Sequence, residues 1–350
     1  MNENIMKKID FINSYKESIN IMEVCGTHTM AIGKYGIRQI INDNINLISG
    51  PGCPVCVTPN KYIDYIYELS LEKEIIVATY GDMIRVPGST PYISLEKAKA
   101  QGANVKLVYS SLDALKLAEK HRDKKVVFLG IGFETTAPAT AIAIKEAYNN
   151  NIDNFHVLSM HKIIEPVMSL LLEDNTLDIQ GFLCPGHVAV VIGEQGFKFI
   201  DKYNCASAIT GFDLEDILSG LVDIIKCIKN KDFTLKNSYN RLVKPEGNKQ
   251  AKFIIEEVFC IKDDEWRGLG TIRDSSLKIR ERFSEFDIEA LYPMKSDISV
   301  TTPCQCGEVL KGSIKPCECK LFHKVCNPDN PIGPCMVSSE GSCAAYYRYG

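Results

Sequence analysis

The alternation of short β-rich runs with amphipathic helical stretches is the feature of this sequence that most restricts its fold. Between about residues 20 and 230, this pattern repeats without a long interruption. Strands that alternate with helices are typical of α/β folds, in which helices cover a parallel sheet. The eight candidate strands are Ile21–Val24, Ile45–Ile48, Ile75–Thr79, Val105–Tyr109, Val126–Gly130, His156–Ser159, Gly181–Cys184 and Ala208–Thr210.

The length of 350 residues favours more than one hydrophobic core. We predict an α/β domain at 20–122, a second α/β domain at 123–230 and a smaller C-terminal domain at 231–350. Beyond residue 230, Phe253–Glu257 is a candidate strand and Leu277–Phe283 a candidate short helix. The helices expected between the strands are Lys61–Leu71, Leu95–Ala100, Leu112–His121, Ala139–Asn149, Pro166–Glu173 and Leu214–Lys229.

Charge and hydropathy exclude several classes of protein. The net charge is -4 and no basic run stands out, so a nucleic-acid partner is not expected. Charged residues interrupt every apolar stretch of the first 18 residues, which is unlike a signal peptide. No apolar run approaches the roughly 18 residues of a membrane span. We therefore expect a cytoplasmic protein.

The 14 cysteines are the unusual part of the composition. In a reducing cytosol, cysteines serve as ligands, nucleophiles or small buried hydrophobes more often than as structural disulfides. Half of them lie between Cys304 and Cys343, and Cys25, Cys53 and Cys56 lie in turns rich in glycine and proline. Three others lie in apolar surroundings and are expected to pack in the core: Cys205, Cys227 and Cys260.

The segments with the most reactive side chains each follow a candidate strand. In open parallel α/β sheets, ligands bind in the crevice beyond the carboxyl ends of the strands. We therefore expect these segments to line such crevices. They are Cys25–Thr29, Gly50–Cys56, Tyr80–Met83, Gly130–Thr136 and Cys184–His187.

The spacing of Cys53 and Cys56 brings two sulfurs close enough for a disulfide or a shared metal. A pair of inert buried thiols is the alternative. Another is half of a zinc site that Cys25 and His28 complete. His28, three residues after Cys25, could instead activate that thiolate or donate to a ligand bound on a metal.

Glu134 and His187 are further candidates at strand ends. Glu134 would place a carboxylate in the crevice, or would act as an N-cap or first-turn acid of the following helix. His187 follows a glycine turn and is expected to line the crevice. Neither a complete dinucleotide fingerprint nor a phosphate-binding loop occurs in the sequence.

The cysteine-rich tail predicts a metal centre, because a segment so poor in apolar residues needs another source of stability. A zinc site built from Cys304, Cys306, Cys317 and Cys319 is one possibility. The wider spacing of Cys319, Cys326, Cys335 and Cys343 better suits an iron–sulfur cluster wrapped by loops.

Together these motifs resemble the HypD family of hydrogenase maturation factors over nearly the whole chain. Seven strings in the same order are highly specific. They are CGTHT at 25–29, GPGCPVC at 50–56, GDMIRVPGS at 81–89, GFETTAP at 132–138, CPGHV at 184–188, CGEVLKG at 306–312 and PIGPCMVSSEGSCAAYY at 331–347.

The resemblance implies a role in assembling the iron of NiFe hydrogenases, which carries two cyanides and one carbon monoxide. It implies a complex with a HypC-type chaperone, cyanide supplied by a HypE-type donor, and a 4Fe-4S cluster in the C-terminal domain. Such a chain is an assembly scaffold with redox activity more than a conventional turnover enzyme. A stand-alone iron–sulfur thiol–disulfide oxidoreductase and a zinc scaffold without a redox role are the competing hypotheses.

By the same resemblance, Cys25 becomes the leading ligand of the nascent iron. Cys53 and Cys56 become a redox-active pair, or one of them, Cys56, a second ligand. The groups expected around the iron are His28, Glu134 and His187, and the expected cluster ligands are Cys319, Cys326, Cys335 and Cys343, with Cys306 as their rival. Two departures from the family pattern lie near that cluster, the additional Cys317 and His323 in place of a small residue.

Overall fold

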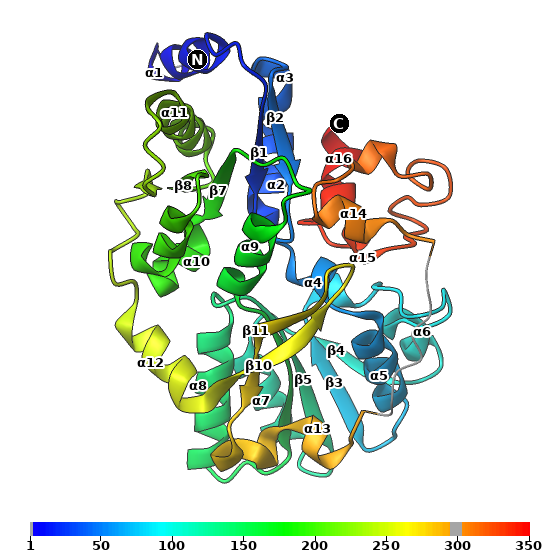
Figure 1. Cartoon of the computed structure of the whole chain (residues 1–350). Helices are drawn as coiled ribbons and strands as arrows, with labels where there is room; N and C mark the ends of the chain where they lie inside the picture. Colours follow the sequence, from blue (N-terminus) through cyan, green and yellow to red (C-terminus); the bar gives the residue numbers. More distant parts are fainter. Residues whose placement is uncertain (1–2, 295–302) are drawn as a thin grey trace.

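The strands of this computed structural model, which describes residues 3–294 and 303–350, form two parallel sheets and one hairpin (Figure 1). The first sheet has the order β2-β1-β7-β8-β9 and the second the order β4-β3-β5-β6. All eight candidate strands are present, so the predicted parallel α/β class is confirmed. The strands are β1 Ile19–Glu23, β2 Ile45–Ser49, β3 Ile75–Thr79, β4 Asn104–Leu107, β5 Lys125–Gly132, β6 Phe155–His161, β7 Gly181–Pro185, β8 Ala206–Thr210 and β9 Lys236–Asn237.

The chain builds the first sheet in two visits. It forms β1 and β2, crosses to complete the second sheet with β3 to β6, and returns to add β7, β8 and β9. In the middle of the first sheet, Ile21 of β1 pairs with Gly181 of β7. The boundary between the sheets therefore does not coincide with the one expected between 20–122 and 123–230. Local periodicity identifies strands but carries no information about which distant strands pair.

The helices lie where the periodicity places them, and α5 to α9 and α11 match the expected helices closely. Their bounds are α1 Glu3–Asn13, α2 Gly26–Lys34, α3 Ile37–Ile40, α4 Pro54–Val57, α5 Asn60–Ser70, α6 Leu95–Ala100, α7 Ser111–Lys120, α8 Ala137–Asn149, α9 Ile164–Glu173, α10 Gly186–Ile192, α11 Leu214–Asn230, α12 Lys249–Val258, α13 Ile288–Leu291, α14 Cys306–Leu310, α15 Pro334–Val337 and α16 Ser342–Tyr349. Short 3-10 turns are η1 Gly81–Met83, η2 Glu194–Lys202, η3 Glu281–Phe286 and η4 Pro316–Glu318.

The two sheets and the C-terminal segment share one hydrophobic core. Val77 of β3, Phe182 of β7 and Met336 of α15 belong to the same cluster of buried side chains. Strands β3 and β7 are buried along their whole length, as expected for parallel strands covered on both faces. The C-terminal segment therefore packs against both sheets, and its cysteines face the same interior as the ends of the strands.

Two predictions beyond residue 230 are wrong. Phe253–Glu257 lies within the helix α12, which Asn248 caps by accepting a hydrogen bond from the backbone amide of Ala251 at 3.0 Å. Leu277–Phe283 spans the end of a strand and the 3-10 turn η3. This strand is β11, Gly270–Ile279, which forms an antiparallel hairpin with β10, Phe259–Trp266. The charged run within β10 hid the hairpin, because it breaks the expected alternation.

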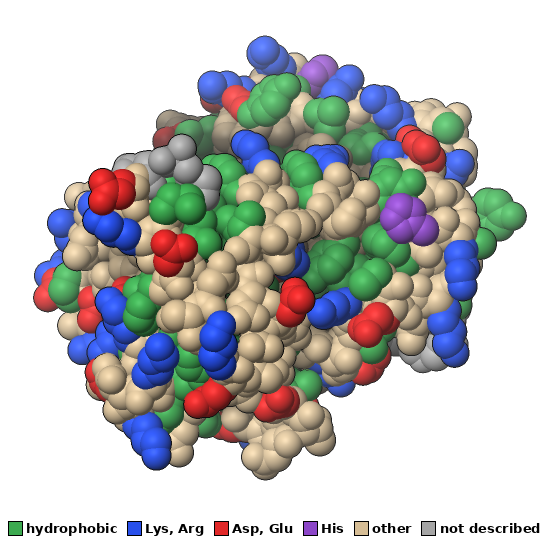
Figure 2. Space-filling model, turned by 90° about the horizontal axis from the view of Figure 1, so that it is seen from above, with side chains coloured by type: hydrophobic (Ala, Val, Ile, Leu, Met, Phe, Trp, Pro, Cys, Tyr) green, Lys and Arg blue, Asp and Glu red, His purple; other side chains and the backbone are tan. Residues whose placement is uncertain are grey.

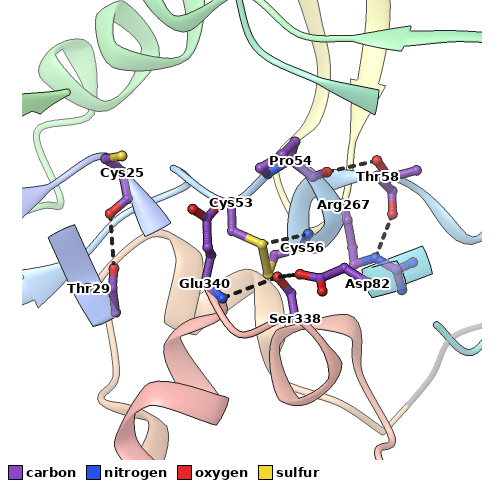
Figure 3. The surroundings of a disulfide bond; sticks show 10 residues. All are labelled: Cys25, Thr29, Cys53, Pro54, Cys56, Thr58, Asp82, Arg267, Ser338 and Glu340. Atoms are coloured by element: carbon purple, nitrogen blue, oxygen red, sulfur yellow. Dashed lines mark hydrogen bonds between the residues drawn. A yellow bond between two sulfur atoms is a disulfide. The ribbon is translucent and has the colours of Figure 1, made fainter. Parts of the chain in front are cut away.

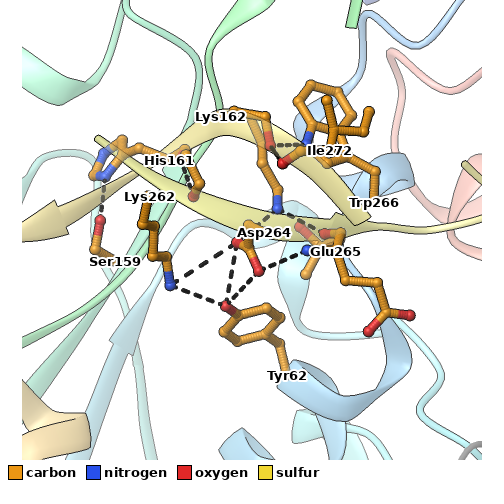
Figure 4. A network of polar contacts seen from close by, with 12 residues as sticks. Tyr62, Ser159, His161, Lys162, Lys262, Asp264, Glu265, Trp266 and Ile272 are labelled. Atoms are coloured by element: carbon orange, nitrogen blue, oxygen red, sulfur yellow. Dashed lines mark hydrogen bonds and ion pairs between the residues drawn. The ribbon is translucent and has the colours of Figure 1, made fainter. Parts of the chain in front are cut away.

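A buried ion pair holds this hairpin against the second sheet (Figure 4). The ammonium of Lys162, which follows β6, lies 2.8 Å from a carboxylate oxygen of Asp264 and 2.8 Å from the carbonyl oxygen of Glu265. The hydroxyl of Tyr62 on α5 donates to the same carboxylate at 3.1 Å. Lys162 and Asp264 are both buried. The hairpin, β6 and α5 therefore meet at one charged network.

Replacing Asp264 with alanine is expected to cost about 3 to 5 kcal/mol of unfolding free energy, because it leaves the Lys162 ammonium buried and unpaired. Denaturant unfolding of the full chain measures the loss. The matched control replaces Lys162 with methionine in the same variant, which removes the unpaired charge and recovers most of the stability. Equal losses in the single and double variants would contradict a net role for this pair.

On the face seen from above in Figure 2, lysine, arginine and acidic side chains alternate, with small hydrophobic areas between them. Among the described residues, no helix combines the length and apolarity that crossing a membrane requires.

Candidate functional site

All five strand-end segments meet around one cavity of about 270 Å³. The expected convergence at the carboxyl ends of the strands is confirmed, with the correction that one cavity serves both sheets. A second cavity, of about 310 Å³, has no cysteine or histidine among its described lining residues. The first cavity therefore holds the reactive side chains; those lining it include Cys25, Thr27, Tyr80, Asp82, Thr135, His187, Ser338 and Glu340.

Cys25 lies between β1 and α2, at the N-cap position of the helix. Gly52 makes this place possible, because a Cβ there would overlap the backbone of Val24 and Cys25. Burial and the Glu340 carboxylate raise the pKa of the Cys25 thiol to about 11, against the backbone amides of His28 and Thr27. The sulfur is therefore protonated at neutral pH and must lose its proton to bind a metal.

Cys53 and Cys56 form a disulfide at the start of α4 (Figure 3). The backbone amide of Cys56 donates to the sulfur of Cys53 at 3.2 Å, and the Thr58 hydroxyl donates to the carbonyl of Pro54 at 2.8 Å. The side chains are almost inaccessible, with Cys53 3% and Cys56 0% exposed. The sequence therefore predicted the proximity of the two sulfurs correctly.

The two candidate histidines face a common aromatic ring. His28 Nε2 lies 2.9 Å from both the Gly211 carbonyl and the Thr210 hydroxyl, and burial lowers its pKa to about 4. His187 stacks on Phe212 with ring centroids 3.9 Å apart and lines the cavity. The imidazole of His28 is thus occupied by the loop after β8, and its backbone amide is the part that interacts with the Cys25 sulfur.

Glu134 caps a helix, although a different one from that expected. Its Oε1 accepts a hydrogen bond from the backbone amide of Ile164 at 3.0 Å, at the start of α9. Its Oε2 is buried and has no hydrogen-bond partner among the described residues. Burial raises the pKa of this carboxyl to about 7. Beside the cavity lining of Phe133 and Thr135, Glu134 can hold or release a proton near neutral pH.

This raised pKa predicts a pH-dependent stability. Glu134 binds its proton more tightly in the folded chain, so the unfolding free energy falls as the pH rises from about 4.5 to about 7. Replacing Glu134 with glutamine removes that fall, and the variant should gain on the order of 2 to 3 kcal/mol relative to wild type at pH 8 but not at pH 4. Unfolding curves at both pH values measure the difference. Glu146→Gln, at an exposed position on α8, is the control, and a gain that is equal at both pH values would contradict the assignment.

The sequence reasoning missed the acidic side of the cavity. The hydroxyl of Thr27 donates to Glu340 Oε1 at 2.7 Å, and the hydroxyl of Ser338 donates to Asp82 Oδ2 at 2.7 Å. These contacts bring the turn between α15 and α16 next to Cys25 (Figure 3). The available signal was the string VSSEG, which lies inside a family motif but was overlooked beside the neighbouring cysteines.

Six cysteines of the C-terminal segment line another, smaller pocket, which we call the cysteine pocket. Within residues 3–294 and 303–350, no three Cys, His, Asp or Glu side chains converge closely enough to hold one metal ion. The pKa of Cys335 is raised by burial and by the neighbouring Cys343 and Cys304, so this thiol is neutral. Its cysteines are Cys304, Cys306, Cys319, Cys326, Cys335 and Cys343.

The four predicted cluster ligands thus lie together, along with the rival Cys306 and with Cys304. Cys317 is exposed and does not line the pocket, so the zinc set that includes it is not assembled. His323 adopts a left-handed φ of 59° and stacks on Tyr347. Of the three expected core cysteines, Cys205 and Cys227 are buried and Cys260 is only half-buried.

The comparisons with known proteins agree with the sequence motifs. The family described as "HypD: Hydrogenase formation hypA family" matches residues 1–350. A hydrogenase maturation factor HypD from Cupriavidus necator is 43% identical over 340 residues, covering 95% of this chain and 89% of the relative.

Two further relatives come from distant organisms. The HypD of Escherichia coli is 43% identical over 334 residues, covering 95% of this chain and 89% of the relative. A putative hydrogenase expression/formation protein of Methanocaldococcus jannaschii is 41% identical over 352 residues, covering 99% of this chain and 97% of the relative. With a match over its full length and several relatives above 40% identity, this chain belongs to the HypD family of hydrogenase maturation proteins.

Proposed function

We propose that this chain is the scaffold on which the iron centre of NiFe hydrogenase receives its two cyanides and one carbon monoxide. The iron is the cargo, held in the cavity that the five strand-end segments form, and Cys25 is its leading ligand. The observation that carries the proposal is the convergence of Cys25 and His187 on one cavity beside the Cys53–Cys56 disulfide. A HypC-type chaperone shares the iron and a HypE-type protein donates the cyanide.

The chemistry of the cavity suits this cargo. A soft thiolate favours an iron that also binds cyanide and carbon monoxide. Iron binding displaces the proton of Cys25, and the Glu340 carboxylate, held by Thr27, is the nearby acceptor. Because His187 is stacked on Phe212 and burial lowers its pKa, it presents a neutral imidazole to the cavity. The cavity therefore offers sulfur and nitrogen from two strand ends and a proton acceptor from the turn between α15 and α16.

The cysteine pocket fits a resident 4Fe-4S cluster. Its donors are sulfurs alone, the set that holds such clusters. Six cysteines line the pocket, which is enough to supply the four thiolates that such a cluster would need. Cys319, Cys326, Cys335 and Cys343 remain the proposed ligands, and Cys304 joins Cys306 as a rival. When bound, this cluster supplies single electrons.

The disulfide lies next to that source of electrons. Helix α15, which carries Cys335, packs against α4, which carries Cys56. Reduction of the disulfide to two thiols consumes two electrons and two protons. We propose that Cys53 and Cys56 cycle between these states during ligand attachment, and that Cys56 in its thiolate form is a second ligand for the iron.

Burial of the disulfide disfavours the competing stand-alone thiol–disulfide oxidoreductase. Exchange requires a substrate thiolate to attack one of the two sulfurs directly. Cys53 and Cys56 are 3% and 0% exposed, so an external thiolate cannot reach them in this conformation. The geometry therefore favours a scaffold whose disulfide receives electrons from a donor inside the same protein, the proposed cluster.

Anaerobic purification together with the HypC-type chaperone tests the proposal. We expect a brown protein with iron and acid-labile sulfide, and infrared bands for cyanide and carbon monoxide when the HypE-type donor is supplied. A colourless zinc protein would contradict the cluster. Absence of the infrared bands from an intact complex would contradict the scaffold role.

A further inference from the structure

Arg267 lies at the tip of the β10–β11 hairpin, between the Cys53–Cys56 disulfide and the cysteine pocket. Its backbone amide donates to the carbonyl of Val57 at 2.8 Å, and its Nε donates to the carbonyl of Thr58 at 2.8 Å. Its Nη1 donates to the side chain of Asn60. Two of these donors hold the C-terminal end of α4, the helix that carries Cys56, and the third holds the first residue of α5; Figure 3 shows the contact to Thr58.

These contacts leave one guanidinium nitrogen of Arg267, Nη2, without an explanation. Arg267 Nη2 is buried and has no hydrogen-bond partner among the described residues, which also provide no ion-pair partner for this guanidinium. A buried donor on a cation that stays unsatisfied costs free energy. Burial lowers the pKa of Arg267, and Cys306, Cys335 and Cys304 of the cysteine pocket oppose that effect. The groups that act electrostatically on this cation are therefore three thiols of the cysteine pocket and the carboxylate of Asp64.

Two contacts fix the position of the hairpin tip. Gly268 has a φ of 74°, and a Cβ there would overlap the backbone of Gly307, so the tip touches α14 immediately after Cys306. Three residues before Arg267, Asp264 of β10 pairs with the buried Lys162. Arg267 is thus held between α4 and the cysteine pocket by packing on both sides.

We propose that Arg267 compensates the negative charge of the cysteine pocket, with Nη2 donating to a sulfur of the bound cluster, and thereby raises the reduction potential of that cluster. This inference rests on the proposed cluster and adds a residue outside its cysteine ligands. A cluster held by four thiolates becomes more negative by one charge on reduction. A guanidinium in a low-dielectric interior stabilises the more negative state, so the reduced form is favoured.

The test measures the cluster potential directly. The full-length protein is purified anaerobically with its cluster as wild type, Arg267→Gln and Arg267→Lys, and each is titrated with dithionite and redox mediators under EPR detection. Arg267→Gln is expected to lower the one-electron potential by at least 59 mV, which is a tenfold change in the equilibrium constant. Arg267→Lys keeps the charge and should lie between Arg267→Gln and wild type. Arg280→Gln is the matched control, because Arg280 also donates to a backbone carbonyl but is exposed and contacts α12 instead of α4.

Each outcome decides the proposal. A loaded Arg267→Gln protein whose equilibrium constant stays within twofold of wild type would overturn it. If Arg267→Gln fails to load a cluster while Arg267→Lys loads one, the need for the charge is supported. If both variants fail to load, the side chain acts only through its grip on α4 and charge compensation is overturned. A wild-type protein without a cluster signal would instead reject the proposed cluster itself, which separates the two failures.

Discussion

Replacing Cys25 with alanine is expected to abolish the cyanide and carbonyl infrared bands of the purified complex. Among the described residues that line the cavity, Cys25 is the only cysteine, and it is not part of the disulfide. Alanine removes the sulfur but keeps the extended backbone of the N-cap position, so α2 and the wall of the cavity should persist. The measurement is the infrared spectrum of the variant after co-purification with the HypC-type chaperone.

The control for this experiment is Cys227→Ala. Cys227 is a buried thiol on α11 that packs in the core behind the first sheet, away from the cavity. Its variant should keep both sets of bands. Undiminished bands in Cys25→Ala would contradict the ligand role, and the elution volume of the complex shows whether a loss of bands reflects failed assembly of the two proteins.

Replacing Cys335 with alanine is expected to lower the bound iron and acid-labile sulfide by on the order of tenfold or more. Cys335 is 1% exposed, and its helix α15 packs against α4. Since metal binding also contributes folding free energy, the variant should unfold at a lower temperature. Iron and sulfide analysis per chain, together with a thermal melt, provides the two readouts.

An exposed cysteine from the same segment serves as the control. Cys317→Ala should retain its iron and its melting temperature, because Cys317 lies outside the cysteine pocket. If Cys335→Ala kept its full iron and sulfide, Cys335 would not be a ligand. If Cys317→Ala lost its iron and sulfide, the ligand set would have to include Cys317, as the alternative zinc set of the sequence analysis does.

The sequence predicts strands and helices well where a local period identifies them. Runs such as Ile75–Thr79 and helices such as Leu95–Ala100 have the same bounds in the structure. It fails for β10, because Lys262, Asp263 and Asp264 interrupt the alternation. The buried partner that neutralises Asp264, Lys162, lies about a hundred residues earlier, and no local pattern shows such a pairing.

The residues of the candidate site also divide into those that a local sequence pattern identifies and those that it does not. Cys25, Cys53 and His187 were recognisable because each follows a strand in a turn rich in glycine or proline. Arg267 was not, because a lone arginine has no spacing signature, and Glu340 had no signal beyond its place inside the motif at 331–347. Their positions depend on how the tail and the hairpin fold back onto the strand ends, which is information that only tertiary contacts contain.

The two visits of the chain to its first sheet have a consequence during synthesis. Strands β1 and β2 emerge early. The second neighbour of β1 in the sheet is β7, which is made about 130 residues after β2. At ribosomal speeds of roughly 5 to 20 residues per second, that interval lasts on the order of ten seconds. During this time the thiols of Cys25, Cys53 and Cys56 are outside the ribosome without the β7 side of the cavity. Under the proposed function, the iron therefore meets a complete cavity only after β7 has been made.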